Sequence, residues 1–331
     1  MSALPGSELL GLGAAQPTDV LTGSELGQPF GKSAEWIRAR TGITALRRVG
    51  APDELAGLAS RAAAEALAAA GLPGDAVDLV IDATCSRPAG LGDSAPFGAD
   101  QAPRAGRMTI NAACSGFCYA LQTADNLIRT GSVRHVLVVA AERMSQLLDP
   151  DDLGTSIIFG DGAGAAVIGP SESDRPGIGP SVMGSDGSQH GLIQWEAGGF
   201  LRMAGQEVFR WAVEHMPGVA RAACRRADLG LGDIDVFVPH QANLRIIDAI
   251  TRTLALEPRV VVADDVSLSG NTSAASIPIA LTGLLETGRA RAGQLALLVG
   301  FGAGLSYAAQ VVRLPDHTPS RPRRTFPSVD R

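Results

Sequence analysis

Three side chains in this sequence could act together as a nucleophilic site. Cys114 stands in NAACSGF, His240 follows the apolar run DVFVP, and Asn271 stands in LSGNTSAAS. A cysteine thiolate at a helix N-terminus is stabilised by the helix dipole and by free amide groups, and a nearby histidine adds to this stabilisation. Cys114 is therefore a candidate nucleophile, with His240 and Asn271 as candidate partners.

Each of these residues also has an ordinary structural interpretation. Cys114 could be a small buried apolar residue, His240 a structural histidine, and Asn271 a turn or helix cap. The other three cysteines, Cys85, Cys118 and Cys224, lack the setting of Cys114 and are expected to take no part in the chemistry.

An internal repeat favours a joint role. The strand-like runs Val77 to Ala83 and Ile234 to His240 start 157 residues apart (234 minus 77), and the endings LIRTG at Gly131 and LLETG at Gly288 are again 157 apart. A fixed period of this kind indicates a duplicated unit.

The repeat predicts that two of the candidate residues are equivalent. Cys114 lies 17 residues before the first of these glycines and Asn271 lies 17 residues before the second. His240 lies at the C-terminal end of a strand, where open α/β sheets place ligand sites. If the two halves pack about a pseudo-twofold axis, the three side chains converge at the interface.

Short apolar strands that alternate with helices predict an α/β protein whose sheets are covered on both faces. The run GPSESDRPGIGP divides the chain into halves at 1–172 and 173–313, and a flexible tail is expected over 314–331. Residues 86–107 are rich in Pro and Gly and predict a long loop. The pattern predicts helices near 53–70, 114–130, 205–227, 242–256 and 274–287.

The composition excludes several classes of protein. Of 331 residues, 45% are hydrophobic and 19% are charged, which is not the composition of a disordered chain. A net charge of −6 argues against a general affinity for nucleic acid or for an anionic membrane. Four scattered cysteines without a CxxC pair predict neither a disulfide framework nor a metal site. No apolar run reaches the roughly 18 residues needed to cross a bilayer, so a cytoplasmic protein is expected.

Five motifs carry a family resemblance: NAACSGF, PHQAN, GNTSAASIP, FGDGAGAA and FGAGLSY. They resemble, in order and spacing, the motifs of the β-ketoacyl-acyl carrier protein synthase III branch of the thiolase superfamily, over roughly residues 5 to 313. The resemblance implies a five-layered αβαβα fold built from two duplicated halves, and a homodimer.

The resemblance also implies a mechanism. Cys114 would attack an acyl thioester, and the amides of Cys114 and Ala303 would form the oxyanion hole. His240 and Asn271 would bind the carbonyl of malonyl-acyl carrier protein and stabilise the enolate that forms on loss of CO2. Phe301 resembles the gating aromatic beside the cysteine, and its alternative is an ordinary core residue. No metal or permanently bound cofactor is implied, because the CoA or phosphopantetheine thioester is the substrate.

The entrance partly matches the family. EWIRARTGI resembles the segment that holds the CoA nucleotide, which assigns this role to Trp36 and Arg40. An arginine that the family often carries in a DRGT-like segment is replaced by Leu153, which weakens or alters CoA recognition. Arg210 and Arg245 match basic positions of the carrier-protein docking surface, and the alternative is that they are only solvated.

Two segments depart from the family pattern. The family's FPSxACQxQ-like segment is replaced within 84–107, where Phe97 or Gly98 and Asp100 or Gln101 stand at the expected Cys and Gln. The run LIQWEAGG places Trp195 and Glu196 where the family has mostly small or apolar pocket residues. We expect both changes to affect acyl selectivity.

The favoured interpretation is a decarboxylating enzyme that primes polyketide or other secondary metabolism. One alternative is an acyltransferase on the same scaffold that does not decarboxylate. The other is a non-catalytic partner subunit of a synthase.

Overall fold

The structure of the protein is a computed structural model, and it describes residues 6–50, 54–86, 97–98, 100–171, 177–195 and 199–316. Glu196 lies outside these residues, as do half of the predicted loop 86–107 and the tail from residue 317.

The first half of the chain forms a mixed sheet of five strands. The strands are β1 (Ser7–Ala15), β4 (Leu79–Ala83), β5 (Gly106–Ile110), β6 (Val136–Arg143) and β7 (Asp161–Pro170). Their order across the sheet is β1-β7-β6-β4-β5; β5, β4 and β6 are parallel, and β7 is antiparallel to both β6 and β1.

A second sheet repeats this order. Its strands are β8 (Val182–Ser185), β11 (Val236–Pro239), β12 (Val261–Val262), β13 (Leu295–Gly302) and β14 (Ser306–Arg313). Their order is β8-β14-β13-β11-β12; β13, β11 and β12 are parallel, and β14 is antiparallel to both β13 and β8. Strand by strand, the two sheets have the same topology, as the sequence repeat predicts.

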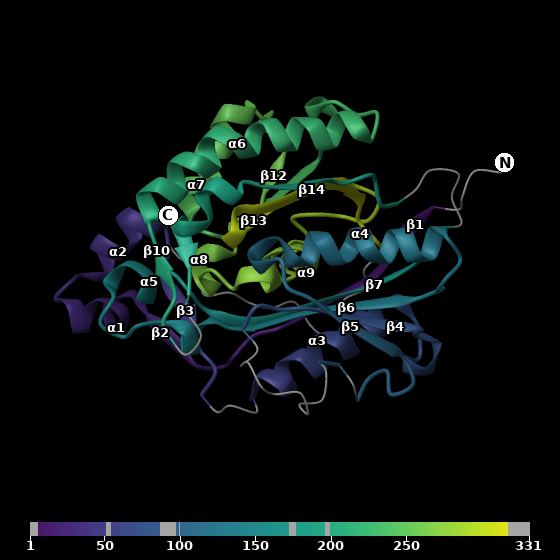
Figure 1. Cartoon of the computed structure of the whole chain (residues 1–331), viewed down its shortest axis with the longest axis horizontal. Coiled ribbons are helices and arrows are strands. Elements are labelled where there is room, and N and C mark those ends of the chain that lie inside the picture. The colour runs from purple at the N-terminus through teal and green to yellow at the C-terminus, as the bar shows by residue number, and fades with distance from the viewer. Residues whose placement is uncertain are drawn as a thin grey trace.

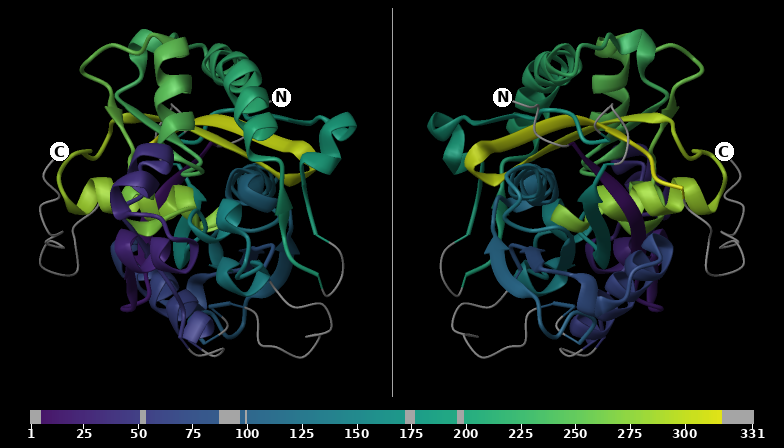
Figure 2. Two further views of the ribbon diagram at one scale, coloured as in Figure 1. Left: turned by 90° about the vertical axis from the view of Figure 1, so that its left-hand side faces the viewer. Right: turned by 90° about the vertical axis from the view of Figure 1, so that its right-hand side faces the viewer.

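The helices and the two sheets make five layers (Figure 1). The principal helices are α3 (Glu54–Ala70), α4 (Gly116–Arg129), α6 (Gly205–Arg226), α7 (Leu244–Leu254) and α9 (Ser276–Glu286). From bottom to top of Figure 1, the layers are α3, the first sheet, α4 with α9, the second sheet, and α6 with α7. The end-on views show the central helices enclosed between the sheets (Figure 2). The predicted αβαβα arrangement is thus confirmed, and all five predicted helices are present to within two residues at each end.

Smaller elements cover the end of the molecule where the site lies. They are β2 (Val20–Thr22), α1 (Gly23–Gly27), η1 (Gln28–Phe30), α2 (Ala34–Thr41), β3 (Ala45–Arg47), η4 (Met144–Leu147), α5 (Leu153–Ser156), η5 (Gly187–Leu192), β9 (Ile193–Gln194), β10 (Arg202–Met203) and α8 (Val266–Ser269). The remaining short turns are η2 (Gly74–Ala76), η3 (Ala113–Ser115), η6 (Leu231–Asp233), η7 (Ser273–Ala275) and η8 (Ala303–Leu305).

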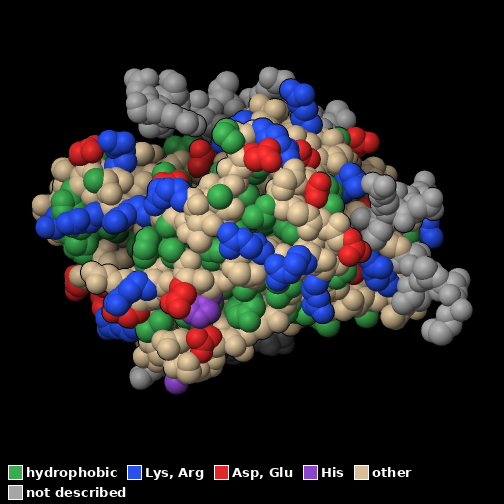
Figure 3. All heavy atoms as spheres, turned by 90° about the horizontal axis from the view of Figure 1, so that it is seen from above, with side chains coloured by type: hydrophobic (Ala, Val, Ile, Leu, Met, Phe, Trp, Pro, Cys, Tyr) green, Lys and Arg blue, Asp and Glu red, His purple; other side chains and the backbone are tan. Residues whose placement is uncertain are grey.

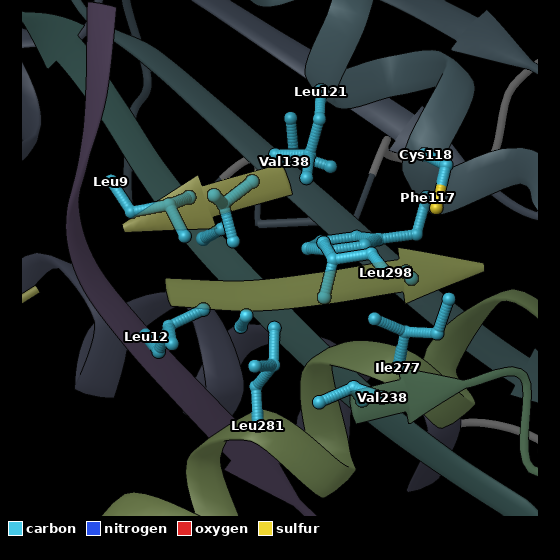
Figure 4. Close-up of a cluster of buried hydrophobic side chains, with 14 of the residues drawn as sticks. Leu9, Leu12, Phe117, Cys118, Leu121, Val138, Val238, Ile277, Leu281 and Leu298 are labelled. Atoms are coloured by element: carbon cyan, nitrogen blue, oxygen red, sulfur yellow. The ribbon is translucent and has the colours of Figure 1, made fainter. Parts of the chain in front are cut away.

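The central layer is the core of the molecule. Phe117 and Leu121 of α4 and Ile277 and Leu281 of α9 pack between strands of both sheets, and each is at most 2% exposed (Figure 4). Most side chains of α4 and α9 are buried, and burial of apolar side chains is the main favourable contribution to folding.

The repeat does not make Cys114 and Asn271 equivalent, contrary to the prediction. Helices α4 and α9 begin 160 residues apart (276 minus 116), whereas Gly131 and Gly288 beyond their ends are 157 apart and share a φ of 71°. The difference of three residues arises because α4 has 14 residues and α9 has 11, so the two helices match at their C-terminal ends and not at their starts.

The helix starts show the true correspondence. Ala113 and Ser273 are the two residues of positive φ that open η3 and η7, and Asn111 and Asn271 each accept the amide N–H two residues ahead. The counterpart of Asn271 is therefore Asn111. The counterpart of Cys114 is Ala274, so the second half keeps the turn without the thiol.

The predicted flexible tail starts too early. Leu314 is 2% exposed, its N–H donates to the carbonyl of Gln294 at 2.9 Å, and its own carbonyl accepts the N–H of Gly293 at 2.9 Å. An apolar residue with both backbone groups paired belongs to the folded part of the chain. In the described residues, no helix has the length and apolar character that a membrane span requires.

The central layer gives a first prediction. Phe117→Ala removes a fully buried ring and is expected to lower the free energy of unfolding by about 3–5 kcal/mol, measured by urea denaturation. As a control, Phe200→Ala removes a ring that is 43% exposed and should change the stability by about 0.5 kcal/mol or less. Equal effects of the two substitutions would contradict this description of the core.

Candidate active site

A cavity of about 80 Å3 lies where the two halves meet. Cys114 of η3, His240 after β11, Asn271 before η7, and Phe301 and Ala303 at the end of β13 all line it. The structure therefore brings together five of the residues that the sequence singled out. A larger hollow of about 780 Å3 on another face of α7 contains none of them.

The Cys114 turn is held by close backbone packing against β13. A methyl group at Gly302 would come within 2.8 Å of the Cys114 nitrogen and 2.9 Å of its Cβ, and one at Gly300 within 3.0 Å of the Ser115 Cα. The strand can approach the turn so closely only because both positions lack a side chain.

Two serines brace the same contact. The Ser306 hydroxyl lies 2.9 Å from the Ser115 hydroxyl, 3.1 Å from the carbonyl of Ala112 and 3.0 Å from the carbonyl of Ala303. It thus connects the turn that carries Cys114 with the turn that carries Ala303. The sequence patterns did not indicate this role of Ser306.

The amides of Cys114 and Ala303 are free to bind an oxyanion. Each residue lies in the first turn of a short helix, where backbone N–H groups lack an intrahelical partner. Among the described residues, neither amide has a backbone acceptor. Two such donors beside one nucleophile are the requirement for an oxyanion hole.

Burial raises the pKa of the Cys114 thiol to about 12, and a hydrogen bond from Ser273 offsets only part of this shift. Desolvation of the charged form therefore opposes the thiolate that the sequence predicts from the helix N-terminus and His240. The proton must leave the sulfur when Cys114 attacks.

His240 is a neutral hydrogen-bond donor. Its side chain is 2% exposed, burial lowers its pKa to about 3, and its Nδ1 lies 2.8 Å from the Ser276 hydroxyl. The Ser276 oxygen already accepts the Gln241 amide N–H at 3.3 Å, so the Ser276 proton can point to Nδ1. This arrangement favours hydrogen on Nε2, the ring nitrogen left for the cavity.

Asn271 presents its amide nitrogen. Its Oδ1 accepts the Ser273 amide N–H at 2.9 Å, which fixes the orientation of the side-chain amide. Its backbone N–H and carbonyl bond to Ile158 and Gly160, so the residue is anchored to the first half at both ends. The side-chain NH2 group is then the part of Asn271 left to bind a ligand.

The rest of the cavity wall is apolar. Phe301 is 3% exposed and meets His240 edge-on with ring centroids 5.3 Å apart. Ile193, Trp195 and Leu201 line the cavity, as Trp195 was expected to do.

Cys85, which the sequence predicts to take no part in the chemistry, also lines this cavity. Its Sγ lies 3.3 Å from the Ser273 hydroxyl and 3.4 Å from Oε1 of the buried Glu142. Nothing in the spacing of the sequence indicated these contacts, because they join segments 57 and 188 residues apart.

Trp36 and Arg40, which the family resemblance assigns to the CoA nucleotide, stack on each other, and neither lines the Cys114 cavity. The Arg40 guanidinium lies 4.2 Å from the centroid of the Trp36 ring, a cation–π contact on α2. Leu153 at the start of α5 packs in the same apolar cluster as Trp36. A cationic side chain is therefore absent at that position, as the sequence shows.

Basic side chains are spread over the face formed by α6 and α7, with acidic ones among them (Figure 3). Arg210 is highly exposed and pairs with Glu207 at 3.0 Å, while Arg245 is exposed in the first turn of α7. The pairing with Glu207 reduces the charge that Arg210 offers to a partner.

The residues at 97–101 that depart from the family pattern lie away from the cavity. Phe97 is 8% exposed and packs in the cluster of α3 and the first sheet, and Asp100 and Gln101 bond to Ser60 of α3. None of these residues lines the Cys114 cavity of the same chain.

Two family profiles match this chain. The profile described as 3-oxoacyl-[acyl-carrier-protein (ACP)] synthase III covers residues 108–187, and the profile of the C-terminal part of the same enzyme covers residues 224–314.

Curated relatives match over nearly the whole chain. The β-ketoacyl-[acyl-carrier-protein] synthase III of Mycobacteroides abscessus is 45% identical, with 93% of this chain and 94% of the relative covered. Synthase III 1 of Streptomyces coelicolor is 41% identical, with 94% and 97% covered.

Solved structures agree with these relatives. The priming β-ketosynthase of a polyketide biosynthetic pathway is 40% identical and superposes with a TM-score of 0.90, covering 96% of this chain and 99% of that one. The 3-oxoacyl-(acyl carrier protein) synthase III of Pseudomonas aeruginosa is 35% identical with a TM-score of 0.87, covering 95% and 100%.

The packing at Gly302 gives a second prediction. Gly302→Ala should slow alkylation of Cys114 by iodoacetamide about a hundredfold, because the new methyl group displaces the Cys114 turn. Peptide mass spectrometry measures the rate, and circular dichroism checks the fold. Gly283→Ala, where an added Cβ has no atom within 4 Å, is the matched control and should react like the parent. An unchanged rate in Gly302→Ala would refute the role given to this contact.

Proposed function

Because the chain belongs to the β-ketoacyl-[acyl-carrier-protein] synthase III family, we propose that it loads an acyl starter on Cys114 and condenses the starter with malonyl-acyl carrier protein. The chain is thus a ketosynthase III-type acyltransferase. The observation that carries the site assignment is the convergence of Cys114, His240 and Asn271 on one cavity beside two free amides.

In the loading step, the Cys114 sulfur attacks the carbonyl carbon of the acyl thioester. The carbonyl oxygen becomes an oxyanion, and the N–H groups of Cys114 and Ala303 donate to it. The carbon–sulfur bond of the donor then breaks, which leaves the acyl group on Cys114 and releases the donor thiol. The serine brace at Ser306 keeps the two amides at a fixed separation.

In the condensation step, His240 and Asn271 act as neutral donors. Nε2 of His240 and the amide nitrogen of Asn271 bind the thioester carbonyl of the malonyl group. Loss of CO2 converts this thioester to an enolate, whose negative oxygen both donors stabilise. The carbanion then attacks the acyl-Cys114 carbonyl. Neutral donors suit this task because they stabilise charge only as it develops.

The surroundings of the site support a specialised priming enzyme. Trp195, Ile193 and Leu201 make a small apolar wall, which favours an apolar acyl group. A priming ketosynthase of a polyketide pathway is among the most similar structures. We place the reaction in polyketide or related secondary metabolism on these grounds.

The same proposal includes the substrates and the assembly. Trp36 and Arg40 would hold a CoA nucleotide, and Arg210 and Arg245 would bind an acidic carrier protein. We further propose a homodimer and a division of the chain at 172/173. The matched strand order of the two sheets supports this division.

One experiment tests the proposed reaction directly. The protein is incubated with acyl-CoA and acyl-carrier thioesters, and its intact mass is measured. The parent should gain one acyl group, and Cys114→Ala should gain none. An acyl adduct on the Cys114→Ala variant would show that another residue is the nucleophile.

A third prediction separates loading from decarboxylation. Asn271→Ala removes one enolate donor and should slow CO2 release from malonyl-acyl carrier protein about a hundredfold or more, while Cys114 still accepts the acyl group. Asn271→Asp keeps the bond to the Ser273 amide but loses the NH2 donor, so it should be slow as well. Release of CO2 by Asn271→Ala at the parent rate would instead support the acyltransferase alternative.

A fourth prediction concerns the donor. Since Leu153 cannot bond a phosphate, Cys114 should load faster from a carrier-bound thioester than from the CoA ester, and the advantage should fall as salt rises. Arg245→Glu should slow only the carrier reaction by about tenfold to a hundredfold, since a charge-assisted contact contributes about 1.5–3 kcal/mol. Arg252→Glu, the same change at the other end of α7, is the control. The rates of Cys114 loading from both donors are measured by stopped flow at two ionic strengths. Faster loading from the CoA ester, unchanged in Arg245→Glu, would overturn the prediction.

A further inference from the structure

Glu142 is a buried carboxylate close to the nucleophile. It ends β6 with no exposed surface, and it lies on the same face of the strand as Val138 and Ala140, which point into the central layer. Burial raises its pKa. In the described part of the chain, no Lys or Arg forms an ion pair with it.

Uncharged donors surround the carboxylate instead. Glu142 accepts hydrogen bonds from the Thr84 hydroxyl at 3.0 Å, from the amides of Cys85 and Ser86 at 3.2 and 3.0 Å, and from the Ser86 hydroxyl. The Cys85 thiol donates to Oε1 at 3.4 Å. Hydrogen bonds of this kind favour the ionised carboxylate in the absence of a cation.

These contacts continue from Glu142 to Cys114. The Cys85 sulfur lies 3.3 Å from the Ser273 hydroxyl. Ser273 opens η7, which packs against the Cys114 turn η3, and its hydroxyl lowers the pKa of the Cys114 thiol. We name Ser273, Cys85 and Glu142 the thiol relay. Cys114, Cys85 and Ser273 all line the active-site cavity, and Glu142 lies behind them.

Once Glu142 is ionised, its carboxylate fixes the direction of every bond in the relay. A carboxylate only accepts, so the single proton of Cys85 points to Glu142. The Cys85 sulfur must then accept the Ser273 proton, and the Ser273 oxygen must accept the Cys114 proton. The Cys114 proton therefore points away from its sulfur toward the carboxylate, which leaves the sulfur lone pairs for the thioester.

We propose that the thiol relay removes the proton of Cys114 when its sulfur attacks the acyl thioester. As the Sγ–carbon bond forms, the Cys114 proton passes to Ser273, the Ser273 proton to Cys85, and the Cys85 proton to Glu142. As the carbon–sulfur bond of the donor breaks, the same three transfers run in reverse, and Ser273 protonates the departing sulfur. The relay ends unchanged, and the net reaction is acyl exchange between two thiols. The inference rests on the proposed loading reaction.

His240 is poorly suited to this task. Burial lowers its pKa to about 3, and its Nε2 is occupied by hydrogen in the favoured tautomer, so it cannot accept the thiol proton. A buried carboxylate with a raised pKa is the stronger base of the two.

Few titratable groups act on Glu142 apart from the relay. Cys85 faces it from the end of β4 and Cys114 from η3, and both thiols have raised pKa values. Gly162 of β7 lies opposite it and carries no charge, and the packed turn η7 contributes Ser273. Arg143, the next residue, lies on the opposite face of β6, the face that packs against α3. The pH dependence of loading should therefore report the ionisation of Glu142.

The roles within the relay differ. Ser273 contacts the nucleophilic sulfur, whereas Cys85 and Glu142 act through Ser273 and are positioning residues. Cys85 gives the sharpest test, because serine at position 85 keeps a donor and an acceptor while alanine removes both.

The experiment compares Cys85→Ala and Cys85→Ser with the parent in single-turnover loading of Cys114 by an acyl-CoA ester. Cys85→Ala should load about a hundredfold more slowly at pH 7, lose the fall in rate on acidification that reports Glu142, and lose the solvent deuterium isotope effect of a multi-proton transfer. Cys85→Ser should restore the rate and the isotope effect to within about tenfold of the parent. Cys224→Ala, a buried cysteine outside the cavity, should load like the parent.

A second readout needs no acyl substrate. Alkylation of Cys114 by iodoacetamide, followed at the Cys114 peptide, should slow in Cys85→Ala and recover in Cys85→Ser. A Cys85→Ala variant with parent rates and pH profile overturns the relay, and so does a Cys85→Ser variant as slow as Cys85→Ala, because the effect would then come from packing. If the parent accepts no acyl group from any thioester, the proposed function fails, and the alkylation rates still decide the relay.

Discussion

Exclusion of water from the central layer is the constraint on which the rest of the structure depends. Helices α4 and α9 are enclosed by two sheets, and their first turns end at the cavity between the halves. The same desolvation that stabilises the core acts on every ionisable group at these turns. It raises the pKa values of Cys114 and Glu142 and lowers that of His240, so each group is pushed toward its neutral form. Chemistry in this site must therefore proceed through hydrogen bonds that are set before the substrate arrives.

The duplicated framework explains how such hydrogen bonds are placed. Both halves contain the same turn, in which an asparagine side chain accepts the amide two residues ahead and a residue of positive φ follows. In the first half the turn carries Cys114. In the second half it frees the NH2 group of Asn271, and the next helix begins with Ser276, which orients His240. The same turn thus places the proposed nucleophile in one half and the proposed enolate donors in the other.

Close approach between the halves is as important as the turns themselves. Glycines at 300 and 302 let β13 lie against the Cys114 turn, and Ser306 ties that turn to Ala303. The two oxyanion amides come from different halves of the chain, so their separation depends on this interface. A small shift of one half relative to the other would separate the nucleophile from its oxyanion hole.

The sequence by itself determined the class of fold, the duplication and the five main helices, and it singled out Cys114, His240 and Asn271, which the fold brings to one cavity. Apolar periodicity and short motifs are local signals, and they survive in a single chain because each reports a backbone preference or a buried face. The roles proposed for Trp36 and Arg40 also come from a local motif.

Only the tertiary structure decided the register of the repeat, the ionisation of the site and the contacts of Cys85. A fixed offset could not reveal that α4 is three residues longer than α9, because the ends of the helices match while their beginnings do not. The setting of Cys114 suggested a thiolate, but the pKa of a thiol depends on how much water surrounds it, and residues distant in the chain determine that. Cys85, Ser273 and Glu142 meet through contacts across 57 to 188 residues, and no spacing in a linear sequence encodes a meeting of that kind.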